Sequence, residues 1–393
     1  MKNKNNLIIL LSLILAIVLG LFCPNIVNEI SFIGTIYVNL LKFMIFPIIS
    51  TTIIVTIYNS KKNKDKLLPK TILLFVIMFV VSFLLTSLVV YFLKPAVNYN
   101  FNAIEWTGEV TSFSFKDVLV NLFPTNIITM IQNNSLFTII LFSVLVGSVS
   151  SKVEDGQSVI KVINGIKNIS YKILHYIMYL TPLAVISLLG SAIANYGSLI
   201  FDMGGKYILM AYLCSVLVMI IVMILPVSII CKINPFTYIK KISKVWLMTI
   251  TTCSSAATLP TTIKVCNEEL NVPSKITNIT VPLGCTIHMC GGAVSFALLG
   301  LFCSQLYGID ISITKFIIMI ISATLINMAA PGIPNGGIVI GASYLTLLNI
   351  PITFIGFYSS IYKLLDMSYT TLNVTGDISA NVILNKFISK KKL

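Results

Sequence analysis

This chain of 393 residues contains no arginine, and its 13 acidic residues are outnumbered by 27 lysines. Only 10% of its residues are charged, whereas 56% are hydrophobic. Apolar runs close to the length that crosses a bilayer recur along the chain, so we expect a polytopic membrane protein. Without arginine, a buried acidic ligand would find no bidentate guanidinium to pair with.

Two further absences narrow the function. The eight cysteines lie mostly inside predicted spans and have no paired spacing, so the sequence predicts neither a disulfide framework nor a zinc site. No basic surface with aromatic or base-reading groups lies outside the predicted spans, which argues against nucleic-acid binding. The first apolar run ends in Cys23-Pro24, a poor cleavage site, so we interpret it as an uncleaved span rather than a signal peptide.

The lysines determine the predicted topology. The positive-inside rule places lysine-rich loops in the cytoplasm, and here it puts both termini there and the protein in the cell membrane. Twenty-one lysines fall in six such clusters, at 1–6, 60–70, 151–172, 232–244, 261–275 and 386–393. The first six spans are predicted at about 7–23, 35–58, 69–94, 118–150, 172–196 and 206–231.

Beyond residue 244 the apolar segments are too short to cross or are broken. The segment 245–265 contains Ser254-Ser255-Ala-Ala-Thr258-Leu-Pro260, and the segment 312–347 contains Pro331-Gly332-Ile333-Pro334. Between them, a seventh span at 276–306 is interrupted by glycine and polar residues. Non-helical backbone at membrane depth is tolerated only where protein buries it or water reaches it. Two broken hairpins around a broken helix therefore predict an inverted repeat with a binding site near the midplane.

The densest polar stripe lies in the last apolar segment. Asp366, Tyr369, Thr370, Asn373 and Asp377 are spaced i, i+3, i+4, i+7 and i+11, so they share one face of a helix. Asp366 and Asp377 are the only acids well inside an apolar span, and turning them to lipid would be too costly. We therefore expect this stripe to line a polar cavity. A structural polar network between helices is the alternative.

These motifs resemble those of the glutamate transporter family, also called the dicarboxylate/amino acid:cation symporters. The run from Asp366 to Asp377 is similar to the Asp-Met-x-x-Thr-x-x-Asn-Val-x-Gly-Asp motif of that family's eighth span. The serine-rich run before Thr258-Leu-Pro260 is similar to the tip of its first hairpin, and Gly332-Ile333-Pro334 to the tip of its second. Leu84-Leu85-Thr86-Ser87 resembles a third-span motif, and the similarity in motif order extends over nearly the whole chain.

The resemblance implies an all-α fold of eight transmembrane helices plus two re-entrant helical hairpins. It also implies a homotrimer in which each protomer has a scaffold and a mobile transport domain. Residues 1–244 would be mainly scaffold, with the spans at 69–94 and 206–231 joining the transport domain. The core of the transport domain would be 245–393, made of the hairpin 245–265, the span 276–306, the hairpin 312–347 and the span 352–382.

The resemblance also implies positions for the ligands. The expected substrate-binding residues lie on both hairpin tips and the eighth span: Ser254, Ser255, Ile333, Gly337, Asp366, Tyr369, Thr370 and Asn373. The expected residues of two sodium sites are Gly284, Thr286, His288, Asn327, Met328, Ala330, Asn373 and Asp377. Apart from sodium as the coupling ion, with protons as an alternative, no cofactor is expected.

This sequence departs from the family pattern at its charged positions. The family's Asn-Met-Asp-Gly-Thr stands here as His288-Met289-Cys290-Gly291-Gly292, its eighth-span arginine is Tyr369, and Phe83 replaces a common tyrosine. A third cation site would keep the hydroxyls of Thr86 and Ser87 but would have Cys290 in place of a carboxylate. A dehydrated sodium gains too little from a neutral thiol, so we expect this site to be lost. His288 would then either be a neutral histidine hydrogen-bonded to hairpin backbone or carry a proton in place of the cation.

The chemistry of the stripe suits an amino acid. Asp366 offers an acceptor for an ammonium group, and Thr370 and Asn373 offer donors for a carboxylate. Because the chain has no arginine for an acidic side chain, we favour sodium-coupled import of a neutral amino acid by an elevator-type mechanism. The alternative is a glutamate, aspartate or dicarboxylate symporter coupled to sodium or protons, with Lys363, one turn from Asp366, supplying the charge.

Two other classes of protein fit less well. A channel would need a continuous polar pore, whereas the hairpin tips here interrupt any such path. An intramembrane hydrolase could pair Ser254 or Ser255 with His288, but no oxyanion hole accompanies them. We therefore do not expect an enzyme.

Overall fold

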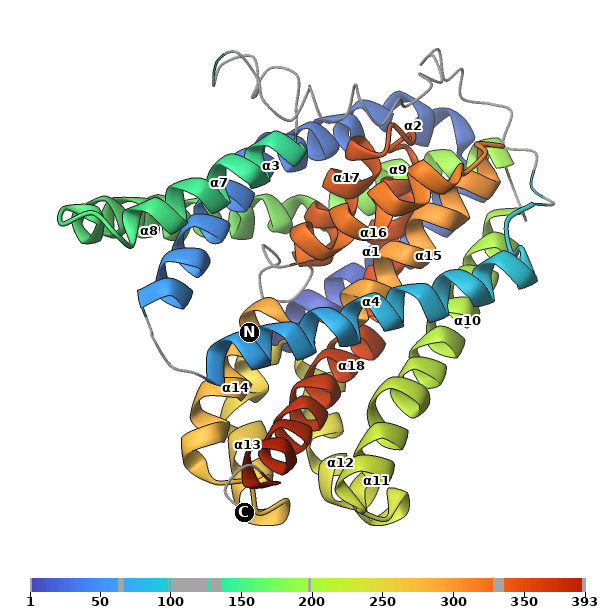
Figure 1. Ribbon diagram of the computed structural model, residues 1–393. Helices are drawn as coiled ribbons and strands as arrows, with labels where there is room; N and C mark the ends of the chain where they lie inside the picture. The colour runs from blue at the N-terminus through green and yellow to red at the C-terminus, as the bar shows by residue number, and fades with distance from the viewer. Residues whose placement is uncertain are drawn as a thin grey trace.

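The computed structural model describes residues 2–62, 67–97, 99, 126, 136–196, 199–327 and 336–390. Within these ranges all regular structure is helical and no strand occurs (Figure 1). The fold of the described chain is therefore all-α, as the family resemblance implies.

The helices before residue 199 are α1 (Lys2–Phe22), α2 (Pro24–Glu29), α3 (Ser31–Lys62), α4 (Leu67–Leu93), α7 (Leu136–Ser150), α8 (Gly156–Ile177) and α9 (Thr181–Tyr196). The later helices are α10 (Leu199–Val218), α11 (Leu225–Cys231), α12 (Pro235–Thr252), α13 (Ser255–Lys264), α14 (Ser274–Ile287), α15 (Cys290–Leu306), α16 (Ile313–Asn327), α17 (Gly336–Leu347) and α18 (Phe354–Lys390). Short non-α turns follow three of them, at Met178–Leu180, Met219–Ile224 and Val265–Glu269.

Several described helices are long and apolar enough to cross a bilayer. By length and composition alone these are Pro69–Leu93, Phe201–Cys231 and Ser274–Leu306. A fourth span results if Ile14–Phe22 and Pro24–Tyr37, which are bent by 114°, are counted together. The described chain thus carries membrane-spanning helices, while the total of eight spans stays a prediction.

The segment predicted as the first hairpin is two helices, α12 and α13. The chain breaks between them at Cys253, whose φ of 46° is left-handed, and at Ser254, which is extended. Ser254 begins α13 by accepting a hydrogen bond from the backbone N–H of Ala257 at 3.3 Å. The helix α12 starts ten residues before the predicted 245, because Asn234 caps it through the N–H groups of its first turn.

Two more interruptions lie in the same half of the chain. The helices α14 and α15 are separated by His288 and Met289, both in extended conformations, within the interruption predicted for the seventh span. The helices α16 and α17 flank residues 328–335, so the predicted tip residues Met328, Ala330 and Ile333 lie outside the described residues.

The predicted fifth span differs most from the structure. Helix α8 begins at Gly156, well before the predicted start at 172, and the helical path then continues through Met178–Leu180 into α9. The lysines and asparagines between 160 and 172 suggested a loop, yet apolar residues recur beside them at helical spacing. In Figure 1, α7 and α8 extend to one side of the remaining helices.

Helix α18 is 37 residues long and lies among the others, in contact with α10, α12, α14 and α15 (Figure 1). Hydroxyl groups on one of its faces bind α12. Thr371 shares a hydrogen bond of 2.8 Å with Thr249, and Thr375 accepts one of 2.9 Å from the indole N–H of Trp246. Hydrogen bonds between membrane helices favour one register, so α12 and α18 are positioned as a pair.

A second polar contact joins α18 to α14. The Asn381 side chain is fully buried, donates to the hydroxyl of Thr277 at 3.1 Å and accepts from that of Thr280 at 2.5 Å. The two contacts satisfy both halves of the carboxamide, which would otherwise be buried unpaired.

Replacing Asn381 with alanine should therefore destabilise the protein. The change removes two hydrogen bonds and leaves threonine hydroxyls buried, at a cost of about 1–3 kcal/mol, or a melting temperature lower by roughly 2–5 °C in detergent. The control is Ser359→Ala, because the Ser359 hydroxyl binds only the Gly356 carbonyl of its own helix, at 2.8 Å. Equal melting temperatures for Asn381→Ala and the wild type would contradict this account.

Candidate functional site

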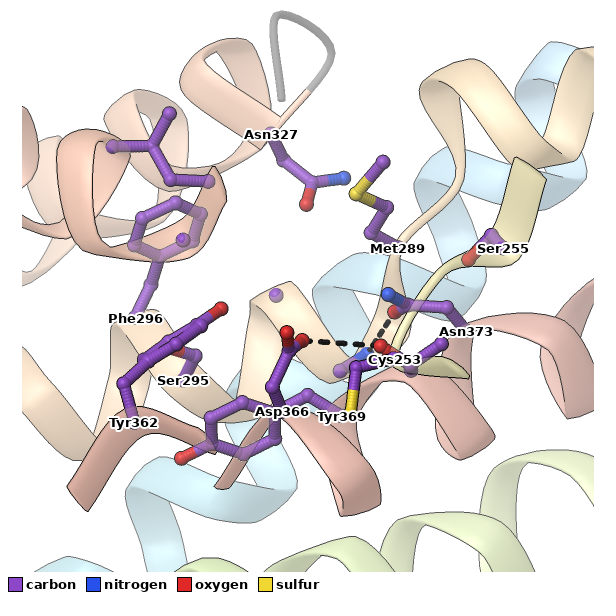
Figure 2. A pocket seen from close by; sticks show the side chains of 15 residues that line it. Cys253, Ser255, Met289, Ser295, Phe296, Asn327, Tyr362, Asp366, Tyr369 and Asn373 are labelled. Carbon is purple, nitrogen blue, oxygen red and sulfur yellow. Dashed lines mark hydrogen bonds between the residues drawn. The ribbon is translucent and has the colours of Figure 1, made fainter. Parts of the chain in front are cut away.

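A pocket lies where α15 and α18 meet the ends of the two broken segments (Figure 2). It brings together six of the eight residues predicted to bind substrate. Ser254 caps α13 instead, and Ile333 lies outside the described residues. The described residues that line the pocket are Cys253, Ser255, Met289, Gly291, Gly292, Ser295, Phe296, Asn327, Gly337, Ile340, Tyr362, Asp366, Tyr369, Thr370 and Asn373.

Asp366 is the one charged side chain among these described lining residues. It is 6% exposed, and its Oδ1 accepts a hydrogen bond of 3.0 Å from the Thr370 hydroxyl, one helical turn later. Figure 2 shows its carboxylate directed into the pocket. A buried carboxylate that faces a pocket matches the ammonium group of a ligand in charge.

Asn373 connects α18 to the start of α15. Its Oδ1 accepts a hydrogen bond of 2.7 Å from the backbone N–H of Gly291. A Cβ atom at Gly291 would collide with the backbone of Tyr369, so only glycine allows the two helices to approach this closely. The contact fixes the wall of the pocket beside Asp366.

Tyr369 lines the pocket but does not present its hydroxyl to it. The hydroxyl is buried and makes no hydrogen bond to the described residues, although Ser295 and Tyr207 lie near it. Tyr207 belongs to α10, and in Figure 2 the hydroxyl of Tyr369 points away from Asn327. The Tyr369 ring therefore lines the pocket, while its hydroxyl lies near Tyr207 of α10.

Tyr362 is a site residue that the sequence analysis missed. Its hydroxyl enters the pocket beside Asp366 (Figure 2), and a Cβ atom at Gly337 would collide with it. The signal was present, because Tyr362 precedes Asp366 by four residues and so lies on the same helical face. Glycine at 337 is thus what lets α17 pack on Tyr362.

The residues predicted for one sodium site meet at Asp377. His288 lies between α14 and α15, and its Nδ1 is 2.8 Å from Asp377 Oδ1. A Cβ atom at Gly284 would lie 2.6 Å from the carboxylate carbon of Asp377, so the Gly284 backbone also touches this group. Phe75 of α4 stacks on the imidazole, with ring centroids 4.3 Å apart. The imidazole therefore occupies one side of the Asp377 carboxylate.

One residue predicted for a third cation site, Cys290, lies next to the same histidine. Cys290 Sγ is 3.1 Å from His288 Nε2, so thiol, imidazole and the Asp377 carboxylate form one chain of contacts. The hydroxyls of Thr86 and Ser87 are buried and make no hydrogen bond within the described residues. Two hydroxyls beside a neutral thiol are a poor donor set for sodium, which prefers several hard oxygen ligands.

Residues of the other predicted sodium site are only partly described. Met328 and Ala330 lie outside the described residues, and only the backbone of Thr286 is described. Asn327 ends α16 and lines the pocket, with a side chain that the sequence analysis did not use.

The hydrolase arrangement is not formed. Both ring nitrogens of His288 are engaged, by Asp377 and by Cys290, so neither faces Ser254 or Ser255 as a base would.

Known proteins similar to this chain are transporters. The sequence profile of the sodium:dicarboxylate symporter family matches residues 6–387. The proton/sodium-glutamate symport protein of Geobacillus stearothermophilus is 27% identical, over 96% of this chain and 93% of that protein. The proton/glutamate-aspartate symporter of Escherichia coli (strain K12) is 26% identical, over 98% and 94%. Excitatory amino acid transporter 3 of Bos taurus is 27% identical, over 99% and 87%.

The contact between Gly337 and Tyr362 can be tested by a pair of substitutions. Gly337→Ala should destabilise the protein by about 1–3 kcal/mol, because the new methyl group overlaps the Tyr362 hydroxyl. Tyr362→Phe removes that oxygen, so the double variant should recover part of the lost melting temperature. Gly165→Ala is the control, because a Cβ atom there meets nothing within 4 Å. Additive effects of the two substitutions would show that the residues do not touch.

Proposed function

This chain belongs to the sodium:dicarboxylate symporter family, and we propose that it imports an amino acid together with a cation through the pocket on α18. It is accordingly a membrane symporter and not an enzyme. The observation that carries the choice of ligand is Asp366, a buried carboxylate that is directed into the pocket (Figure 2). The ammonium group of an amino acid compensates its charge, and Thr370 holds the carboxylate in place.

Replacing Asp366 with asparagine should abolish binding of the amino acid. The change removes the charge that attracts the ammonium group but keeps the side-chain shape, so the protein should stay folded and assembled. Uptake of labelled amino acids into proteoliposomes and the thermal shift on adding them measure the loss. Ser368→Ala is the control, because the Ser368 hydroxyl binds only the Leu365 carbonyl of its own helix. Normal uptake by Asp366→Asn would remove this residue from the site.

For the substrate, the relatives favour glutamate or aspartate. Two of the bacterial relatives are named for glutamate or for glutamate and aspartate, which supports an acidic substrate better than the neutral one favoured by the sequence analysis. One contact adds to this support, because Lys363 lies close to the Cys253 thiol at the edge of the pocket. Its ammonium group is a cation that could pair there with an acidic side chain.

A neutral amino acid is the second candidate, and the lining residues favour it. No lysine is among the described lining residues, and Tyr369 stands where the resemblance implies an arginine. A carboxylate on the substrate side chain would enter beside Asp366 without a bidentate partner, which is costly in a buried pocket.

Competition between labelled substrates separates the two candidates. If Lys363 pairs with an acidic side chain, Lys363→Met should weaken aspartate or glutamate uptake at least about 10-fold, because a buried charge loses its partner. If the substrate is neutral, serine or alanine should compete better than aspartate in the wild type, and Lys363→Met should leave them unchanged. Strong aspartate uptake that is insensitive to Lys363→Met would contradict both candidates, because it fits neither an acidic substrate paired with Lys363 nor a neutral substrate.

We further propose that fewer sodium ions bind than the three sites of the resemblance would hold. His288 stands beside Asp377, and the neighbouring site offers a thiol in place of a carboxylate. The relatives are named for both protons and sodium, which supports a mixed choice of coupling ion. No resident cofactor is proposed beyond these coupling ions.

The number of coupled ions can be measured from reversal potentials in proteoliposomes, with sodium and pH gradients varied separately. We expect fewer than three sodium ions for each amino acid, since the site of Thr86, Ser87 and Cys290 lacks an anionic ligand. A stoichiometry of three sodium ions would show that this site is retained. Vesicles without protein provide the baseline for leak.

For the assembly we propose a homotrimer in the cell membrane, with cytoplasmic termini and an elevator-type movement of the transport domain. The exposed apolar residues of α8 support a contact between copies, because they alternate at spacings of three and four like the seam of packed helices. They are Val159, Val162, Ile166, Ile169, Ile173 and Tyr176. The hydrogen bonds that join α12 and α14 to α18 support a transport domain that moves as one body.

A further inference from the structure

The side-chain oxygen of Asn327 is a polar atom for which the described residues provide no hydrogen-bond partner. Asn327 is 2% exposed, lies at the last residue of α16 and lines the pocket. Its Oδ1 is buried and makes no hydrogen bond within the part of the chain that the structure describes. Burying an amide oxygen without a hydrogen bond destabilises the protein. We therefore expect this oxygen to have a function that offsets the cost.

Gly292 makes room for this amide. A Cβ atom at Gly292 would collide with Asn327 Oδ1. A larger residue at position 292 would therefore displace the amide. Glycine within a helix lowers the stability of that helix. At position 292 it also leaves the space that the Asn327 amide occupies. The two residues are far apart in sequence and fit each other inside the pocket.

The pocket therefore has a charged side and a neutral polar side. Figure 2 shows Asn327 across the pocket from Asp366, with the Tyr362 hydroxyl and the Phe296 ring beside the space between them. Asp366 suits the ammonium group of an amino acid, as proposed above. Asn327 is then placed to meet the part of the ligand that extends away from that group.

We propose that the Asn327 carboxamide binds the side chain of the transported amino acid, and that this side chain is neutral and carries a hydroxyl or carboxamide group. The inference rests on the proposed function, since it takes the ligand to be an amino acid held by Asp366. A hydroxyl or carboxamide donates to Asn327 Oδ1 and satisfies it.

Two other classes of side chain fit the Asn327 end less well. An aliphatic side chain leaves the amide unpaired, and a site built around a hydrogen bond discriminates strongly against ligands that lack it. A carboxylate has no proton for Oδ1. If the amide turned over to present its NH₂ group, the carboxylate would still be an anion beside Asp366, with no lysine among the described lining residues.

The test compares serine with alanine and asparagine with aspartate as competitors of labelled uptake in proteoliposomes. In the wild type, serine and asparagine should compete about 10-fold better than alanine and aspartate, respectively. In Asn327→Ala the preference for serine over alanine should fall by about 5- to 10-fold, while alanine uptake continues. A general structural defect would weaken serine and alanine together and leave their ratio unchanged.

A second variant tests the role of the Asn327 amide without replacing Asn327. Gly292→Ala should displace the Asn327 side chain and lower the serine-to-alanine preference in the same direction. Gly205→Ala is the matched control, because a Cβ atom at Gly205 meets nothing within 4 Å and Gly205 lies on α10, outside the pocket. Its preference should equal that of the wild type.

Each result is decisive. An unchanged serine-to-alanine ratio in Asn327→Ala and Gly292→Ala, with uptake retained, overturns the inference and leaves the proposed function standing. Wild-type uptake that prefers aspartate over asparagine overturns it too, while supporting symport of an acidic amino acid. If the wild type takes up no amino acid under any sodium or pH gradient, the proposed function fails and the inference fails with it.

Discussion

Two carboxylates on one apolar helix need partners that lipid cannot provide. Asp366 and Asp377 lie three turns apart on α18, and both are buried, 6% and 2% exposed. Asp377 has its partner within the protein, since His288 lies 2.8 Å away and Gly284 closes against it. Asp366 accepts a hydrogen bond from the Thr370 hydroxyl, and its carboxylate is directed into the pocket (Figure 2). Asp377 therefore contacts neighbouring helices of the protein, whereas Asp366 faces the pocket that we propose binds the ligand.

The surrounding helices follow from the need to keep these carboxylates out of lipid. The breaks between α12 and α13 and between α14 and α15 bring backbone and short side chains to α18, which continuous helices could not do. The break at Cys253 places Ser255 in the pocket, and the break at His288 places an imidazole beside Asp377. On its other polar face, α18 binds α12 through Thr371 and Thr375. The contacts with α12 thus use a different face of α18 from the one that lines the pocket.

The sequence predicted the features that depend on local pattern. The stripe from Asp366 to Asp377 and the interruption near His288 follow from spacing, hydropathy and helix-breaking residues, and the all-helical fold follows from the family resemblance. Features that depend on packing between distant residues were missed. The hydroxyl of Tyr369 lies near Tyr207 of α10, and the roles of Tyr362 and Asn327 depend on Gly337 and Gly292. The periodicity of one segment does not predict its contacts with residues of distant segments. The early start of α8 was missed because its polar face resembled a loop.

The most direct test of this account is a cryo-EM structure of the protein with sodium and its transported amino acid at saturating concentration. We predict ligand density in the pocket, with the ammonium group against Asp366 and the side chain directed toward Asn327. Density at another place, or an empty pocket in protein that transports the same amino acid when reconstituted, would contradict the claim that Asp366 on α18 holds the substrate.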